Sequence, residues 1–219
     1  MTDDSGAAIT DLSDRRVTIW SDYLCPYCWI ARGRARWIEG LGVEVEWLPY
    51  ELHPEVPAEG IDRELLSAGR DPATRSAHGR RLRSLAGEES VDLDYPDVVA
   101  NTRLALEAAE WARSGSEGDF DRFHDAVFRA YWEDGRNIGL VDELAGIAGT
   151  ASLDPVGLTE ALAEGAMRRG VESARAKATE VGATGTPAFL ISRGDAEFLV
   201  PGLQSEEFFM RVLSRIGSR

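Results

Sequence analysis

Two cysteines, Cys25 and Cys28, are the residues of this sequence best suited to carry chemistry. The 219-residue chain contains no other cysteine, and the two lie three positions apart in "SDYLCPYCWIA". Two close thiols can bind zinc, form a structural cross-link or act as a redox couple, and each use makes different demands on the rest of the sequence.

A zinc site is disfavoured because a structural zinc ion needs four ligands, and the sequence offers no second cysteine pair. The histidines are His53, His78 and His124, and none has the short spacing typical of a zinc finger. We therefore expect no bound metal.

A structural disulfide is also disfavoured, because closing so short a loop stabilises a fold only slightly. A reducing compartment would oppose it as well. Two inert, buried cysteines remain an open alternative. The position of Cys25 and Cys28 favours redox chemistry over that alternative, because both fall where a predicted strand passes into a predicted helix.

That junction belongs to a predicted β-α-β unit. Residues 15–21 and 43–50 have the alternation and β-branched content of strands, and residues 25–42 between them have helical spacing. Two strands joined through a helix should be parallel. Pro26 suits the first helical position, where its missing N–H leaves no hydrogen bond unmade.

The helix start explains why Cys25 is the expected nucleophile. Unpaired N–H groups and the positive end of the helix dipole stabilise a thiolate there. Cys28, one turn further on, can then attack a mixed disulfide formed on Cys25. Pro26 and Tyr27 between the thiols are expected to tune redox potential and access.

A second candidate feature is "GATGTPAF", residues 182–189, at the start of the third predicted strand. Pro187 could adopt the cis form, since only X-Pro bonds do so at low cost. Beside the thiol it would leave backbone groups free to pair with a substrate strand. The alternative is an ordinary trans-proline that opens an edge strand.

The rest of the chain divides into helical and strand regions. A proline-containing loop spans 51–60, and helical patterns with almost no strand signal follow over more than 100 residues. Strand character returns at 187–192 and 197–202, with a turn at Gly194 and Asp195, and an amphipathic helix closes the chain at 205–217. On that helix, Phe208, Val212 and Ile216 are expected to share the buried face.

Composition excludes several functions. The net charge of −14 makes non-specific nucleic-acid binding improbable, because such a surface repels phosphates. No apolar run is long enough to cross a bilayer, so we expect no membrane association. The N-terminus is acidic and polar, unlike a signal peptide, which predicts a cytoplasmic location.

These motifs resemble the thioredoxin superfamily, and in particular the FrnE-like branch of the DsbA family of oxidoreductases. The resemblance covers nearly the whole chain and includes "SDYLCPYCWIA", "NTRLALEAAEWA", "FRAYWEDGRNIG", "EVGATGTPAF" and "VPGLQSEEF". It implies an α/β thioredoxin-like fold with an inserted all-helical subdomain. The expected division is a flexible tail at 1–14, a split thioredoxin-like domain at 15–60 and 183–219, and the insertion at 61–182.

The resemblance also assigns roles to residues. It implies that Cys25 is the nucleophile, Cys28 its resolving partner and Pro187 a cis-proline, with Thr186 facing the thiol and influencing the redox poise. Asn101 falls in an "NT" motif of the branch, for which a hydrogen bond at a helix entry is the simpler interpretation. Trp29, Tyr131 and Trp132 could line a groove, but aromatic residues at helical spacing are more often core.

The predicted function is a cytoplasmic thiol–disulfide oxidoreductase that exchanges disulfides with protein or low-molecular-weight thiol substrates. Its substrate-binding residues would be Pro26, Tyr27, Thr186 and Pro187. The Pro-Tyr dipeptide is typical of glutaredoxins, so glutathione is a candidate co-substrate, and no resident cofactor is expected. Open alternatives are a glutathione-dependent isomerase or transferase acting on an aromatic or polyketide-like compound, and a redox-regulated chaperone. The sequence leaves the oligomeric state open.

Overall fold

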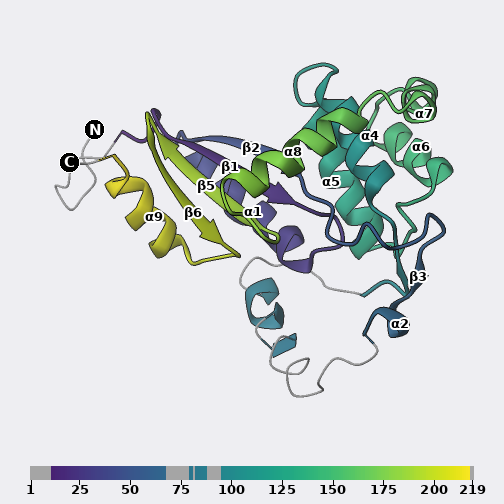
Figure 1. Ribbon diagram of the computed structural model, residues 1–219, viewed down its shortest axis with the longest axis horizontal. Helices are drawn as coiled ribbons and strands as arrows, with labels where there is room; N and C mark the ends of the chain where they lie inside the picture. Colours follow the sequence, from purple (N-terminus) through teal and green to yellow (C-terminus); the bar gives the residue numbers. More distant parts are fainter. Residues whose placement is uncertain (1–10, 68–78, 81, 88–94, 218–219) are drawn as a thin grey trace.

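The computed structural model describes residues 11–67, 79–80, 82–87 and 95–217. A four-stranded sheet in the order β2-β1-β5-β6 forms the centre of one half of the molecule, and a cluster of helices forms the other (Figure 1). The strands are β1 (Arg16–Ser21), β2 (Glu44–Pro49), β5 (Ala188–Arg193) and β6 (Ala196–Pro201). Strands from the two ends of the sequence therefore complete one sheet.

The first half of the sheet is the β-α-β unit expected from sequence. β1 pairs with β2 in parallel, from Arg16 opposite Glu44 to Ser21 opposite Pro49. Helix α1 (Pro26–Gly40) connects them. The second half is the hairpin of β5 and β6, whose turn contains Gly194 at a positive φ of 55°, a conformation that favours glycine.

Each face of the sheet packs against helices because successive residues of a strand point to opposite faces. Val17 and Ile19 of β1 face α1 and α9 (Glu206–Arg215) in one buried cluster. Trp20 faces the other way, towards α8 (Arg168–Glu180), where its indole Nε1 donates to the carbonyl of Ala174 at 3.0 Å. The sheet is thus covered on both sides.

The helical half contains α4 (Arg103–Arg113), α5 (Asp119–Trp132), α6 (Val141–Thr150) and α7 (Pro155–Glu164), while α8 runs from it across the sheet (Figure 1). Its core includes Phe123, Val127 and Tyr131, which lie four residues apart on one face of α5. Phe120, one turn before Phe123, is only partly buried. Asp154 caps α7 by accepting from the N–H of Val156 at 3.0 Å, before Pro155 at the first helical position.

The inserted segment departs from the all-helical prediction. It contains the antiparallel pair β3 (Ile61–Asp62) and β4 (Val98–Val99) alongside α2 (Arg63–Ser67). Residues 98 and 99 are extended, and helix α4 begins only at Arg103. Two-residue strands carry no detectable periodicity, which is why the sequence did not reveal them. Residues 72–87 also have a helical pattern in the sequence, and part of this segment lies outside the described residues.

Two further expectations need correction. On α9 the fully buried residues are Phe209 and Leu213, whereas Phe208 and Val212 are only partly buried. At the other end of the chain, Leu12 is 4% exposed and packs in the cluster between α1 and α9. Residues 11–14 therefore belong to the folded unit, while residues 1–10 of the predicted tail lie outside the described residues.

Candidate active site

Cys25 occupies the junction between β1 and α1. It is the N-cap residue, with extended backbone angles (φ −84°, ψ 113°), and Pro26 follows at the first helical position. The Cys25 carbonyl accepts from the N–H groups of Cys28 and Trp29, at 3.0 and 3.2 Å. The proline is compatible with this turn because a first-turn N–H would have no intrahelical partner.

The structure brings the predicted site residues together. Both cysteines are free thiols, 5% exposed at Cys25 and fully buried at Cys28. The Cys25 Sγ lies 3.4 Å from the carbonyl oxygen of Thr186, to which the thiol donates. The peptide bond between Thr186 and Pro187 is cis. Residues about 160 positions apart in sequence thus meet at one sulfur atom.

The two sulfur atoms have opposite acidities. Burial raises the pKa of the Cys25 thiol, but the hydrogen bonds that the side chains of Cys28 and Thr186 can donate to the thiolate outweigh burial and bring the net pKa below its ordinary value. Burial and the hydrogen bond to Cys25 raise the pKa of Cys28 well above its ordinary value. The Thr186 hydroxyl is buried without a partner among the described residues. It is therefore available to donate to a Cys25 thiolate.

The loop that precedes Cys25 contains a buried carboxyl group. Asp22 is 0% exposed and accepts from the N–H groups of Leu24 and Leu52, at 3.0 and 2.6 Å, and from the Thr102 hydroxyl at 3.2 Å. Burial raises its pKa to about 6 despite these hydrogen bonds. Its negative charge also raises the pKa of Cys25. Asp22 therefore connects the active-site loop to the insertion and opposes ionisation of the nucleophile.

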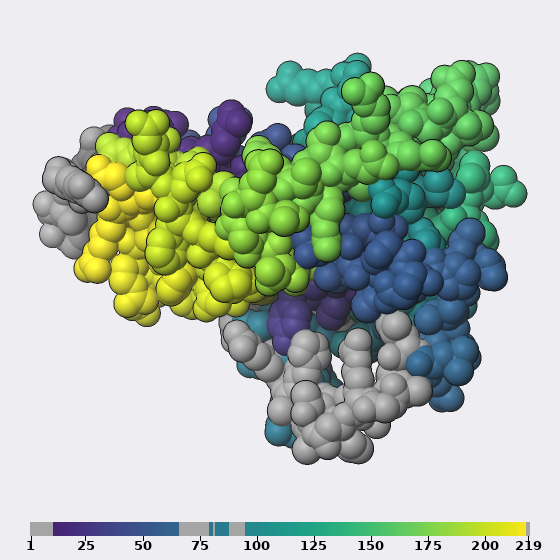
Figure 2. All heavy atoms as spheres, viewed as in Figure 1, coloured from purple at the N-terminus to yellow at the C-terminus, as the bar shows by residue number. Residues whose placement is uncertain are grey.

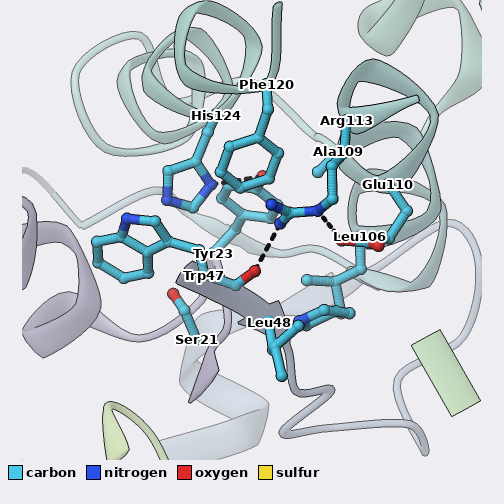
Figure 3. Close-up of a pocket in the computed structure, with 11 residues that line it drawn as sticks. Ser21, Tyr23, Trp47, Leu48, Leu106, Ala109, Glu110, Arg113, Phe120 and His124 are labelled. Atoms are coloured by element: carbon cyan, nitrogen blue, oxygen red, sulfur yellow. Dashed lines mark hydrogen bonds and ion pairs between the residues drawn. The ribbon is translucent and has the colours of Figure 1, made fainter. Parts of the chain in front are cut away.

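The insertion holds the same loop through Tyr23. The Tyr23 hydroxyl bonds to Nδ1 of His124 at 2.9 Å, and the Tyr23 carbonyl accepts from the indole of Trp132 at 2.9 Å. Figure 3 shows His124 beside Phe120. The two rings stack with centres 5.0 Å apart, and the Cζ atom of the Arg113 guanidinium lies 3.7 Å from the centre of the Phe120 ring. Burial lowers the pKa of His124 well below its ordinary value, so the ring is neutral at pH 7.

Cys25 and Cys28 accordingly belong to the hydrophobic core of the insertion rather than to the core of the sheet. That cluster includes Trp29, Tyr131 and Trp132, each at most 3% exposed. These aromatic residues are core, as the simpler interpretation of their spacing held. Asn101 accepts from the N–H of Arg103 at 3.0 Å and donates to the carbonyl of Val56 at 2.6 Å, which is a structural role at the start of α4.

Sequence reasoning did not identify Asp22 or Tyr23 as site residues. Their position between a buried strand and the CPYC motif could have identified them. A charged residue such as Asp22 is seldom buried without a partner, so its presence at this position suggests a specific role. His124 was considered only as a zinc ligand. Within the part of the chain that the structure describes, no three His, Cys, Asp or Glu residues form a group that could hold a metal ion, and none of the helices is long and apolar enough to span a bilayer.

A mixed sheet of this order, with a CxxC motif at the start of its first helix, defines a thioredoxin fold. The model of the DSBA-like thioredoxin domain family matches residues 16–214, so the chain belongs to that family, and it is a disulfide oxidoreductase. An uncharacterized protein of Bacillus subtilis, YwbO, is 29% identical over 207 residues, covering 90% of this chain and 95% of its own.

Solved structures are similar over nearly the same length. A probable DsbA oxidoreductase from Streptomyces coelicolor has a TM-score of 0.80 and 26% identity, covering 92% of this chain and 89% of its own. The cytosolic disulfide reductase DsbM from Pseudomonas aeruginosa has a TM-score of 0.65 and 16% identity, covering 91% and 92%. The expected α/β fold with a helical insertion is thus confirmed.

Proposed function

We propose that this protein exchanges disulfides through Cys25 and Cys28, with Cys25 as nucleophile and Cys28 as resolving thiol. The observation that supports this proposal most strongly is the opposite shift in acidity of two adjacent sulfur atoms. A thiol with a lowered pKa is the better nucleophile at neutral pH, and its neighbour stays protonated until needed.

The reaction has two balanced steps. The Cys25 thiolate attacks one sulfur of a substrate disulfide, a new S–S bond forms, and the released thiolate takes up a proton. Cys28 then loses its proton and attacks Cys25, which releases the second substrate thiol and leaves a Cys25–Cys28 disulfide. The protein is oxidised by two electrons and the substrate disulfide is reduced; the reverse sequence oxidises a dithiol substrate.

Around the nucleophile, we assign Pro26, Tyr27, Thr186 and Pro187 to substrate binding. Thr186 is the best supported, because its carbonyl and hydroxyl both lie at the Cys25 sulfur. Glutathione is our candidate co-substrate, and a cytoplasmic location fits it. The similarity to DsbM, a cytosolic reductase also solved with GSH, supports both ideas. Membership of the FrnE-like branch stays a prediction.

Two serine variants test this function. Cys25→Ser should abolish insulin reduction and disulfide isomerisation, while Cys28→Ser should accumulate a mixed disulfide with substrate that mass spectrometry detects. Full activity of Cys25→Ser would contradict the proposal. Turnover of a small aromatic substrate that needs glutathione and survives Cys28→Ser would instead favour an isomerase.

The direction of electron flow follows from a further measurement. The Cys25–Cys28 couple can be equilibrated with glutathione buffers of known ratio and its reduced fraction determined by thiol alkylation. A potential of about −270 mV, as in thioredoxin, would make the protein a reductant, and one of about −120 mV an oxidant.

A further inference from the structure

The chain is strongly acidic, but one ordered arginine has no carboxylate partner in the part of the chain that the structure describes. Many other described arginines pair with acids, for example Arg32 with Asp125, at 2.5 Å. Arg63, at the start of α2, pairs with no acid among the described residues. Its Nε donates to the carbonyl of Pro96 at 2.5 Å and its Nη2 to the Tyr131 hydroxyl at 2.8 Å.

These contacts hold Arg63 in place without neutralising it. A guanidinium has five N–H donors, and two are used here. The two hydrogens of Nη1 and one of Nη2 remain, along the edge that binds a carboxylate through two parallel hydrogen bonds. Because the side chain is already ordered, little further conformational entropy would be lost when an anion binds.

A chain of contacts connects Arg63 to the active-site loop. The Arg63 guanidinium lies 5.1 Å from the ring centre of Tyr95, which packs edge-on against Trp132 with centres 5.5 Å apart. Trp132 in turn donates to the carbonyl of Tyr23, two residues before Cys25. Tyr95 is 44% exposed, so the arrangement borders solvent. Figure 2 shows the blue residues of this part of the chain at the surface of the molecule.

The electrostatics of Tyr95 agree with this placement. Burial raises the pKa of its phenol, Arg63 opposes that rise, and both Tyr27 and Cys25 lie close enough to add to it. Tyr95 is therefore close enough to both the arginine and the nucleophile to interact with their charges. The net charge of −14 disfavours the approach of anions to the protein as a whole, so a local cation at this point would favour anionic substrates specifically.

We propose that Arg63, positioned against Tyr95, forms a subsite for a carboxylate of the disulfide substrate, and that the preferred substrates are small peptide disulfides of the glutathione type. This inference rests on the proposed function and adds to it the residue that would recognise the carboxylate of such a substrate. Acidic protein disulfides carry the same chemistry and form a second arm of the test.

The experiment uses the full chain with Cys28→Ser, so that the reaction stops at the mixed disulfide on Cys25. The rate of its formation is measured by mass spectrometry with oxidised glutathione and with the same disulfide esterified at its carboxylates. The Cys28→Ser protein should react about fivefold faster with the free acid than with the ester. This ratio corresponds to the upper end of the interaction energies measured for exposed ion pairs. Adding Arg63→Gln should remove this preference and leave the rate with the ester unchanged.

Arg169→Gln is the matched control, because this exposed residue of α8 makes the same change in net charge. It should keep the preference for the free acid. Peptide disulfides with and without a neighbouring glutamate, tested in the same way, show whether acidic chains also use the subsite.

Three results would overturn the inference. They are equal loss of rate with acid and ester in Arg63→Gln, an unchanged preference in that variant, and loss of the preference in Arg169→Gln. In each case Cys25 would still form mixed disulfides, and the proposed function would stand. If neither disulfide reacts with Cys25 while insulin still does, only this inference fails; if insulin does not react either, both proposals fail.

Discussion

Replacing Asp22 by asparagine tests how the buried carboxyl group contributes to stability. The folded protein holds this group at a pKa of about 6, whereas the ordinary value is 3.8. The folded state therefore keeps a proton on Asp22 over a pH range in which the unfolded chain has lost it. In that range the free energy of unfolding must fall as the pH rises.

The size of this effect follows from the shift. A difference of about two pKa units corresponds to about 3 kcal/mol at 1.36 kcal/mol per unit. Asp22→Asn removes the titration, so the variant should gain about 3 kcal/mol relative to the unchanged protein between pH 4 and pH 7. A constant offset from the altered hydrogen bonds to Leu24, Leu52 and Thr102 would not change this slope.

Urea denaturation of both reduced proteins across this pH range measures the difference, and other titrating groups cancel because the two chains share them. A difference in unfolding free energy that stays constant from pH 4 to pH 7 would refute the reasoning. The thiolate absorbance of Cys25 gives a second measurement. Removing the Asp22 charge should lower the pKa of Cys25 further, and an unchanged titration would count against the electrostatic contact.

Two other perturbations have defined outcomes. Thr186→Val keeps the shape but removes the hydroxyl that can donate to the Cys25 thiolate, and should raise the pKa of Cys25. The pH dependence of the rate of Cys25 alkylation, in a Cys28→Ser background, measures this change in pKa. An unchanged pH profile would show that the Thr186 hydroxyl does not stabilise the thiolate. Asp125→Asn breaks the ion pairs with Arg32 and Arg36 that join α5 to α1 and should cost about 2 kcal/mol of unfolding free energy, since Arg32 is buried. Glu44→Gln removes an exposed ion pair with Arg16 and should leave the free energy of unfolding almost unchanged. Equal losses of stability in the two variants would refute the distinction between buried and exposed ion pairs.

The sequence predicted the sheet and the CxxC helix because these features have local signals. Alternation marks β1, β2, β5 and β6, and Pro26 after Cys25 marks the start of α1. The meeting of Cys25 with Thr186 could be expected because β5 pairs with β1 in this fold. Elements of ordinary length with a clear period are predictable for this reason.

What the sequence could not predict depends on contacts between distant residues. The partners of Asp22 are up to 80 positions away, and nothing local to Asp22 specifies Thr102. The predicted buried face of α9 was wrong for Phe208 and Val212, although Ile216 is buried as predicted. The adjacent apolar residues Phe208 and Phe209 fit two helical registers equally well. The structure chose the register that places Phe209 against Phe189 of β5, with ring centres 4.8 Å apart.

The enclosure of both sulfur atoms by the helical insertion means that this segment cannot be treated as a detachable accessory. Trimming the chain to glutaredoxin length would remove the residues that surround Cys28 and open its sulfur to solvent. Because Cys28 is fully buried, reagents reach it only when the residues packed around it move apart. The rate at which Cys28 is chemically labelled therefore measures how often this part of the core opens.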